Sequence, residues 1–260
     1  MILFKINIFM FTASAKNLSI LQLVSLVLTI AGAFVFEYTW EALLYVVVGY
    51  FLYSGIGVSM MLHRYYSHHS FEFKSNILKW ICTWFAIVAG RGSPLGWVYV
   101  HRTHHKFSDT PQDPHDPKTI GWKIFFPHLI HYGDTINKRI IIDMLNKPHI
   151  NINKYYMLFI ILWSVALLMI SPELFYFFYI VPFTLSYIAL DLFVFFSHTY
   201  GYRNFETKDS SKNNWFISLI LWGEGWHNNH HKNPGNFTTK IKYWEVDAIG
   251  YCIDIFRKKT

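Results

Sequence analysis

Residues 42–62, ALLYVVVGYFLYSGIGVSMML, contain no charged side chain and lead directly into His63. A helix that crosses the hydrocarbon core of a bilayer needs about 20 such residues, so this run has the length of one membrane span. This run is one of four, which form two pairs. A short turn separates the two runs of each pair, at 37–41 in the first pair and at 171–173 in the second. The other three runs, apolar almost throughout, are residues 18–36, 155–170 and 174–196. The sequence therefore predicts an all-α integral membrane protein with four spanning helices in two hairpins.

The composition agrees with this interpretation. Of the 260 residues, 53% are hydrophobic and only 15% are charged, whereas soluble proteins carry roughly 25% charged residues. We find no repeat, low-complexity tract or second domain, so residues 1–260 are interpreted as a single domain. The two cysteines lie far apart, which argues against a disulfide framework and suits a reducing compartment.

The cations mark one side of the membrane. All 23 Lys and Arg residues lie in 1–17, 63–154 or 198–260, and none lies in either short turn. The positive-inside rule therefore places both termini and the segments 63–154 and 198–260 in the cytosol. It also explains the net charge of +7 without a nucleic-acid partner. Whether the membrane is a bacterial inner membrane or the endoplasmic reticulum stays open.

Two segments allow a second interpretation. The N-terminal run that ends in Ala13-Ser14-Ala15 fits either an interfacial segment or a cleaved signal peptide. Cleavage would invert the topology, which favours the interfacial segment. The apolar stretch 77–97 is interrupted by charges, glycines and a proline, so we expect a short interfacial or re-entrant element. A fifth span, the alternative, would separate the first histidine group from the second.

Three histidine-rich groups follow the predicted spans: HRYYSHH at 63–69, HRTHH at 101–105 and HNNHH at 227–231. Histidines spaced i, i+3 and i+4 share one face of a helix. Four spans place all three groups on one side of the membrane, where eight imidazoles converge, those of His63, His68, His101, His104, His105, His227, His230 and His231. A zinc ion takes four ligands, so the count favours two metal ions. Nitrogen ligands without thiolates fit iron, copper, nickel or zinc, and dioxygen chemistry at a lipid surface favours iron.

The first group poses a geometric problem. His63 and His68 are five residues apart, which is about 140° around a regular helix. Either the helix ends or unwinds there, or the two histidines serve different metal ions.

HRYYSH, HRTHHKFSDTPQDPHDP and GEGWHNNHH resemble the three histidine boxes of the membrane fatty acid desaturases. The resemblance covers roughly residues 42–256, including WEVD at 244–247, and is strongest to the Δ9 acyl-CoA and acyl-lipid branch, which includes stearoyl-CoA desaturase. It implies four spans with a cytosolic helical cap that holds two iron ions. It also implies dioxygen as the oxidant and insertion of a cis double bond, at Δ9, into a saturated acyl chain.

The resemblance implies the eight histidines above as metal ligands and adds a ninth, His198 in HTYGYR. His69 stands where the family commonly has arginine and is left out. The family also commonly places an asparagine one helical turn before the ninth histidine, where it holds a water on one iron. This chain has Val194 there, whose side chain cannot hydrogen-bond, so either the water is held otherwise or one iron is more open.

Other polar residues near these motifs have two interpretations each. Asp191 either orients a ligand imidazole or pairs with another helix. His115 and Glu224 either support the ligands or belong to turns. The cations Arg102, Lys106, Lys138 and Arg139 either bind phosphates of coenzyme A or lipid headgroups or belong to the positive-inside excess. Three histidines, His128, His131 and His149, are interpreted as surface or interface residues.

The implied partners are a long-chain acyl-CoA or acyl-lipid, O2 and the lipid bilayer. No fused haem domain with a His-Pro-Gly-Gly signature is present, so a separate electron donor of the ferredoxin or cytochrome b5 type is expected. One alternative is a di-iron lipid hydroxylase or ketolase on the same scaffold. The other is a membrane electron carrier or transporter that binds haem or metal, although the predicted spans carry almost no histidine.

Overall fold

The computed structural model describes residues 13–125 and 137–259. Within these ranges the chain is mostly helical, with isolated bridges but no strand. The N-terminal residues 1–12, where the signal-peptide interpretation begins, lie outside the described residues, and so do His128 and His131.

Each of the four predicted apolar runs is helical. The first is α2 (Ala15–Gly32), and the second is α3 (Trp40–Tyr50) continued by η1 (Phe51–Ser67). The fourth joins α9 (Pro172–Leu174), η5 (Phe175–Ile180) and α10 (Val181–Phe196) into one helix. These three helices are long and apolar enough to cross a membrane.

The third run is shorter. It forms α8 (Tyr156–Ile170), which follows α7 (Lys147–Lys154) at an angle of 66°. A fourth span results only if this bent pair counts as one, so the four-span topology stays a prediction.

The helix starts follow from local sequence. Ser14 caps α2, Thr39 caps α3 and Ser171 caps α9, each accepting a hydrogen bond from a backbone N–H three residues later. Helix α10 packs against both α2 and α3. Apolar side chains on the outer face of α2, such as Leu23 at 62% exposed, remain uncovered. Such a surface is expected for a helix that faces lipid.

The stretch 77–97 is a short helix followed by a break. Helix α4 (Asn76–Val88) has 13 residues, fewer than the roughly 20 that a span requires, so the fifth-span alternative finds no support. Gly90 and Gly92 have φ of +79° and +100°, a backbone region that favours glycine. A Cβ at Gly90 would also overlap the ring of Phe183. Helix α5 (Pro94–Phe107) starts directly after this break.

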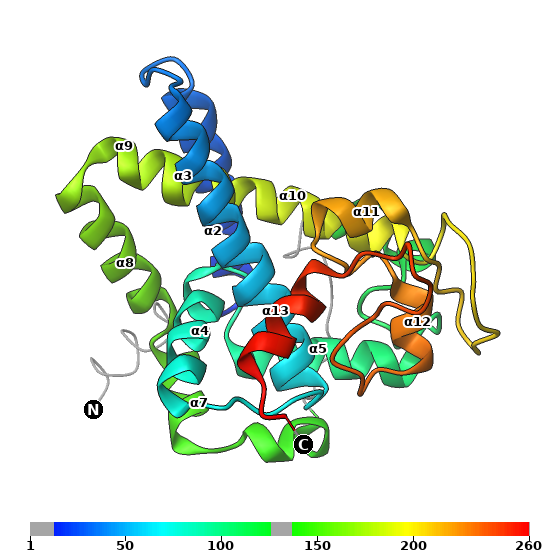
Figure 1. Ribbon diagram of the computed structural model, residues 1–260. Coiled ribbons are helices and arrows are strands. Elements are labelled where there is room, and N and C mark those ends of the chain that lie inside the picture. Colours follow the sequence, from blue (N-terminus) through cyan, green and yellow to red (C-terminus); the bar gives the residue numbers. More distant parts are fainter. Residues whose placement is uncertain (1–12, 126–136, 260) are drawn as a thin grey trace.

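The remaining helices are short and belong to the segments predicted as a cap. They are α6 (Pro117–Ile120), η2 (Gly121–Phe125), η4 (Lys138–Met144), α11 (Trp215–Ile220), α12 (His227–Lys232) and α13 (Ala248–Phe256). Figure 1 shows α5, α12 and α13 away from the turn between α2 and α3, which protrudes at the top of the view. This arrangement brings the three histidine groups together.

Candidate metal centre

The nine predicted ligand histidines form two clusters, and His69 is in neither. The first, called the five-histidine cluster, contains His63, His68, His101, His105 and His230. The second, called the four-histidine cluster, contains His104, His198, His227 and His231. Within each cluster, one nitrogen from every histidine lies within 4.8 Å of the others.

A change in helix type solves the geometric problem of the first group. From Phe51 to Ser67 the helix is a π-helix, whose i→i+5 hydrogen bonds bring residues five apart close to one face. The ring centroids of His63 and His68 are 5.1 Å apart, and both belong to the same cluster. The helix is widened and ends at Ser67, directly before His68, as the first alternative predicted. The two histidines lie in one cluster, which favours a shared metal ion.

The two HxxHH patterns are divided between the clusters. In α5, His101 and His105 belong to the five-histidine cluster, whereas His104 belongs to the four-histidine cluster. In α12 the assignment is reversed, because only His230 belongs to the five-histidine cluster. Helices α5 and α12 thus each contribute to both clusters.

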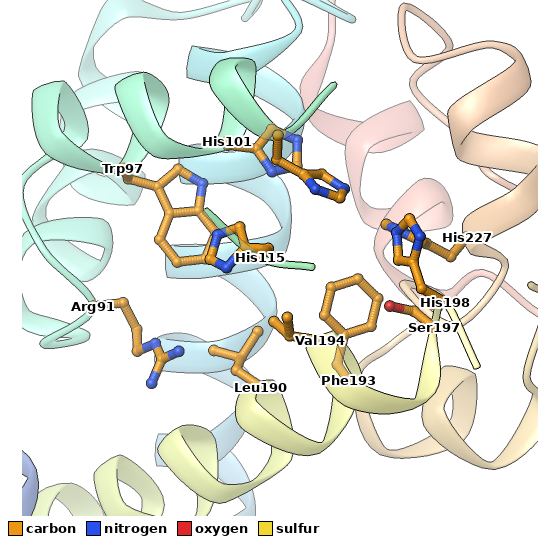
Figure 2. Close-up of a pocket in the computed structure, with 11 residues that line it drawn as sticks. Arg91, Trp97, His101, His115, Leu190, Phe193, Val194, Ser197, His198 and His227 are labelled. Atoms are coloured by element: carbon orange, nitrogen blue, oxygen red, sulfur yellow. The ribbon is translucent and has the colours of Figure 1, made fainter. Parts of the chain in front are cut away.

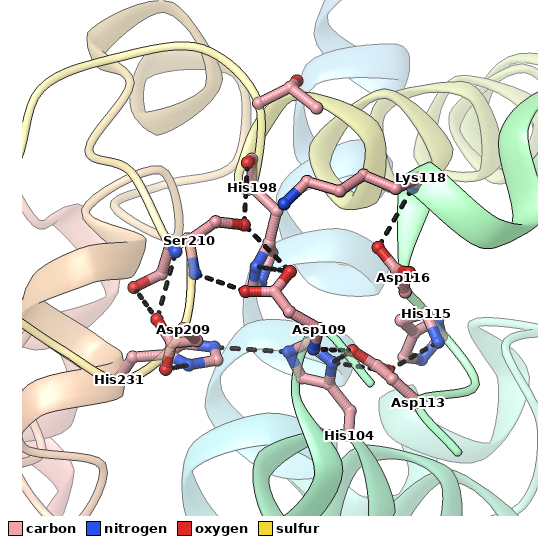
Figure 3. A network of polar contacts seen from close by, with 12 residues as sticks. His104, Asp109, Asp113, His115, Asp116, Lys118, His198, Asp209, Ser210 and His231 are labelled. Carbon is pink, nitrogen blue, oxygen red and sulfur yellow. Dashed lines mark hydrogen bonds and ion pairs between the residues drawn. The ribbon is translucent and has the colours of Figure 1, made fainter. Parts of the chain in front are cut away.

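Four carboxylates face the imidazoles from outside the clusters. Asp113 and Asp209 each lie 2.9 Å from the Nδ1 atom of a histidine, His104 and His231 respectively. Figure 3 shows both pairs, together with Asp109, which lies 3.4 Å from Nδ1 of His198. The fourth pair joins Glu224 to Nδ1 of His63.

At His63, His104 and His231 these contacts favour one tautomer, whereas Nδ1 of His198 has no hydrogen-bond partner among the described residues. A carboxylate accepts Nδ1–H and leaves the Nε2 lone pair directed at the cluster centre, as in metal-ligating histidines. Burial raises the pKa of Asp209, but hydrogen bonds from His231 and Ser211 outweigh burial and hold it well below its ordinary value. Burial also lowers the pKa of both His104 and His231, which favours the neutral imidazole at each.

The donor geometry fits metal ions. Metal–imidazole bonds are about 2.1 Å long, so neighbouring ligands at right angles around one ion lie about 3.0 Å apart. The close Nε2–Nε2 pairs within the clusters are separated by 2.7 Å, between His68 and His101, to 3.3 Å, between His104 and His231. In the latter pair both Nδ1 atoms face carboxylates, so two lone pairs point at each other. Such an arrangement is repulsive unless a cation lies between them.

A narrow cavity of about 50 Å³ adjoins both clusters. Figure 2 shows His101, His198 and His227 among the residues that line it. Trp97 of α5 and the apolar residues Leu190, Phe193 and Val194 of α10 also line it. The arrangement places a hydrocarbon-compatible wall against the candidate metal ligands.

Comparison with known proteins decides the family. A family model described as fatty acid desaturase matches residues 38–250. The chain belongs to the fatty acid desaturase family.

Three relatives show which branch of the desaturases it resembles. It is 36% identical over 236 residues to the sn-1 stearoyl-lipid 9-desaturase of Synechocystis sp., covering 81% of this chain and 67% of the relative. Identity to Delta-9 acyl-lipid desaturase 2 of Arabidopsis thaliana is 29% over 234 residues, with coverage of 85% and 73%. Identity to the acyl-CoA 5-desaturase AL21 of Anemone leveillei is 31% over 243 residues, with coverage of 88% and 72%. The chain is therefore a Δ9 desaturase-like oxidoreductase of lipid metabolism.

The three possible supporting residues of the desaturase have different surroundings. Glu224 contacts His63, as one interpretation predicted. Asp191 does not orient an imidazole. Its carboxylate instead accepts hydrogen bonds from Arg91 on the α4–α5 turn and Gln22 on α2, both at 3.2 Å, so the alternative of pairing with another segment holds. His115 acts indirectly, because its backbone N–H donates to Asp113 over 2.8 Å.

A buried arginine of the first histidine box joins it to the third. Arg64 is 1% exposed. Its guanidinium donates to Glu224 over 2.8 and 3.0 Å and to Asp247 over 2.8 and 3.0 Å. Asp247 also accepts from the backbone N–H of Gly250, at the start of α13. Because Glu224 contacts His63, this network connects WEVD to a candidate ligand.

Helix α12 is held by the two asparagines of HNNHH. Asn228 Oδ1 accepts the backbone N–H groups of Asn204 and Phe205, both at 2.9 Å. The Asn229 amide donates to Glu245 and accepts from Asn213, both at 2.9 Å. Both asparagines are buried, so protein contacts fix the direction of this helix.

The remaining predicted residues lie at the periphery. Arg102 donates to the backbone carbonyls of Tyr66 and Ser67 and to Asp143, so it fastens α5 to the end of η1. Lys106 and Arg139 line a surface groove with Arg102, where phosphate binding stays a prediction. His149 is half-buried, with its ring 5.2 Å from that of Tyr66, in agreement with an interface residue.

Proposed function

We propose that this desaturase uses two iron ions and O2 to insert a cis double bond at Δ9 into a saturated acyl chain. The observation that supports this most is the pair of imidazole clusters beside a cavity with an apolar wall. We propose all nine histidines as iron ligands and Asp109, Asp113, Asp209 and Glu224 as the residues that orient four of them. The names of the Synechocystis and Arabidopsis relatives favour a lipid-linked acyl chain, and the Anemone relative keeps acyl-CoA open.

Bound iron would supply the redox chemistry that removes one hydrogen from each of two neighbouring methylenes, with O2 reduced to two waters. That balance requires two further electrons and two protons, so a separate donor of the ferredoxin or cytochrome b5 type completes the proposal. The protein positions the chain: Leu190, Phe193 and Val194 exclude water and hold the methylenes beside the imidazoles.

Product analysis tests the reaction. Expression in a host that lacks Δ9 desaturation should yield monounsaturated fatty acids with the double bond at carbon 9. His104→Ala should yield none, because His104 is buried within the four-histidine cluster. His69→Ala is the matched control, since that histidine is exposed and outside both clusters. A product that has gained oxygen would instead indicate the hydroxylase or ketolase.

The purified protein tests the metal. Active wild-type protein should contain close to two irons per chain and show a coupled di-iron Mössbauer signal. One metal ion per active chain, or zinc alone, would overturn the di-iron assignment. A Soret band would indicate the haem-binding alternative. Activity is measured on the same sample, because recombinant metalloproteins can acquire zinc.

The cation distribution supports a topology with both termini and both clusters in the cytosol. In a chain whose Cys82 and Cys252 are replaced by alanine, cysteines placed at Glu37 and Glu173 should react with an impermeant maleimide in intact cells. Both positions are exposed, Glu37 between α2 and α3 and Glu173 at the start of the last apolar helix, in α9. Lys258→Cys is the control and should react only after permeabilisation. Protection of either turn in intact cells would contradict the four-span arrangement.

A further inference from the structure

The two clusters differ in how they meet the cavity. The four-histidine cluster has one imidazole fewer, and three of its members, His104, His198 and His227, line the cavity. His101 is the one cavity-lining member of the five-histidine cluster among the described residues. We call the side of the four-histidine cluster that faces this cavity its open side, because a metal ion held by four imidazoles would have room there for a further small ligand.

Ser197 carries a hydroxyl group without a hydrogen-bond partner among the described residues, and it lies next to the four-histidine cluster. It follows the last residue of α10, is 1% exposed, and lines the same cavity as its neighbour His198. Figure 2 shows its oxygen among the ring edges of Phe193 and His198. Residues three and four apart share a helix face, so Val194, Ser197 and His198 lie together.

The hydroxyl of Ser197 has no hydrogen-bond partner within the described residues. Several other hydroxyls of this chain bond the carbonyl four residues back, as Ser54 does to Tyr50 and Thr199 does to Phe195. Ser186 is also buried and unpaired on α10, but it does not line the cavity. A buried hydroxyl without a partner is costly, and at Ser197 a ligand in the cavity can satisfy it.

We propose that Ser197 donates a hydrogen bond to a water molecule or small anion on the open side of the four-histidine cluster. Val194 has no polar side chain to hold such a ligand, and Ser197 does so from the same helix face. This inference rests on the proposed di-iron function and assigns a ligand-holding role to a residue outside the histidine motifs.

Azide titration of the iron-loaded protein, followed by its absorption band, tests the assignment. Ser197→Ala should weaken azide binding about fivefold to tenfold, the effect of losing one hydrogen bond. Ser186→Ala should bind azide like the wild type. The double variant Ser197→Ala with Val194→Asn should recover part of the affinity, because position 194 offers a polar group to the same space.

Iron content and product analysis on the same preparations separate two kinds of failure. An unchanged azide affinity in Ser197→Ala, with two irons and normal product, overturns the role of Ser197 alone. Equal weakening in Ser186→Ala also overturns it, since the effect would then be structural. Wild-type protein without iron or product would overturn the proposed function itself.

Discussion

Replacing Arg64 by methionine is expected to lower the free energy of unfolding by about 3–5 kcal/mol, because it leaves buried carboxylates without their cation. Glu224 and Asp247 are both buried, and both contact this guanidinium at 2.8 Å. Burial raises the pKa of Asp247, but the charge and hydrogen bonds of Arg64, together with backbone N–H donors, hold it below its ordinary value. For a domain of this size the loss corresponds to a fall in Tm of roughly 6–20 °C.

Thermal unfolding in detergent measures this effect. Lys259→Met is the matched control, since it removes an exposed cation that lies 3.6 Å from Asp254, and surface pairs contribute little. The Tm of Arg64→Lys should lie between those of the wild type and Arg64→Met, because an ammonium group cannot reproduce the bidentate contacts of a guanidinium. A similar Tm for Arg64→Met and Lys259→Met would show that the buried network does not stabilise the fold.

Replacing His198 by alanine is expected to abolish desaturation while the folded protein stays in the membrane. His198 is buried, and its Nε2 atom lies 3.1 Å from that of His227. None of the four residues before it, Val194, Phe195, Phe196 and Ser197, offers an imidazole as a substitute. The measurement is lipid product per folded protein, and full activity in His198→Ala would remove the ninth ligand.

Val194→Asn is the companion variant. We expect it to retain activity, because the family pattern places a polar side chain there. An amide left unpaired in this apolar wall would cost about 1–3 kcal/mol of stability. Loss of activity in a well-folded Val194→Asn protein would indicate that the site has diverged towards another oxidation chemistry.

The apolar runs and the histidine spacing predicted the helices and the residues that converge, because both are local patterns. The spacing of His63 and His68 predicted that the helix ends or unwinds there, but it did not predict a π-helix that already begins at Phe51. Nor was the division of His101 and His104 between two clusters predictable, since it depends on how α5 meets α12.

The supporting carboxylates show a second limit. Asp109 stands beside a histidine motif, but Asp209 lies in a polar loop and meets His231 only through the fold. Asp191 pairs with Arg91, a hundred residues earlier in the chain. No periodicity reports such long-range contacts, so the sequence predicted the candidate ligands more completely than the residues that orient them.

The asparagines of HNNHH bear on whether this motif is transferable. Helix α12 has six residues, and so short a helix does not hold its shape in water by itself. Hydrogen bonds with loop 204–213 and with Glu245 hold its conformation. Grafting the motif onto another scaffold would therefore transfer three imidazoles without the contacts that orient them. A minimal transplant of this motif has to include the loop and Glu245.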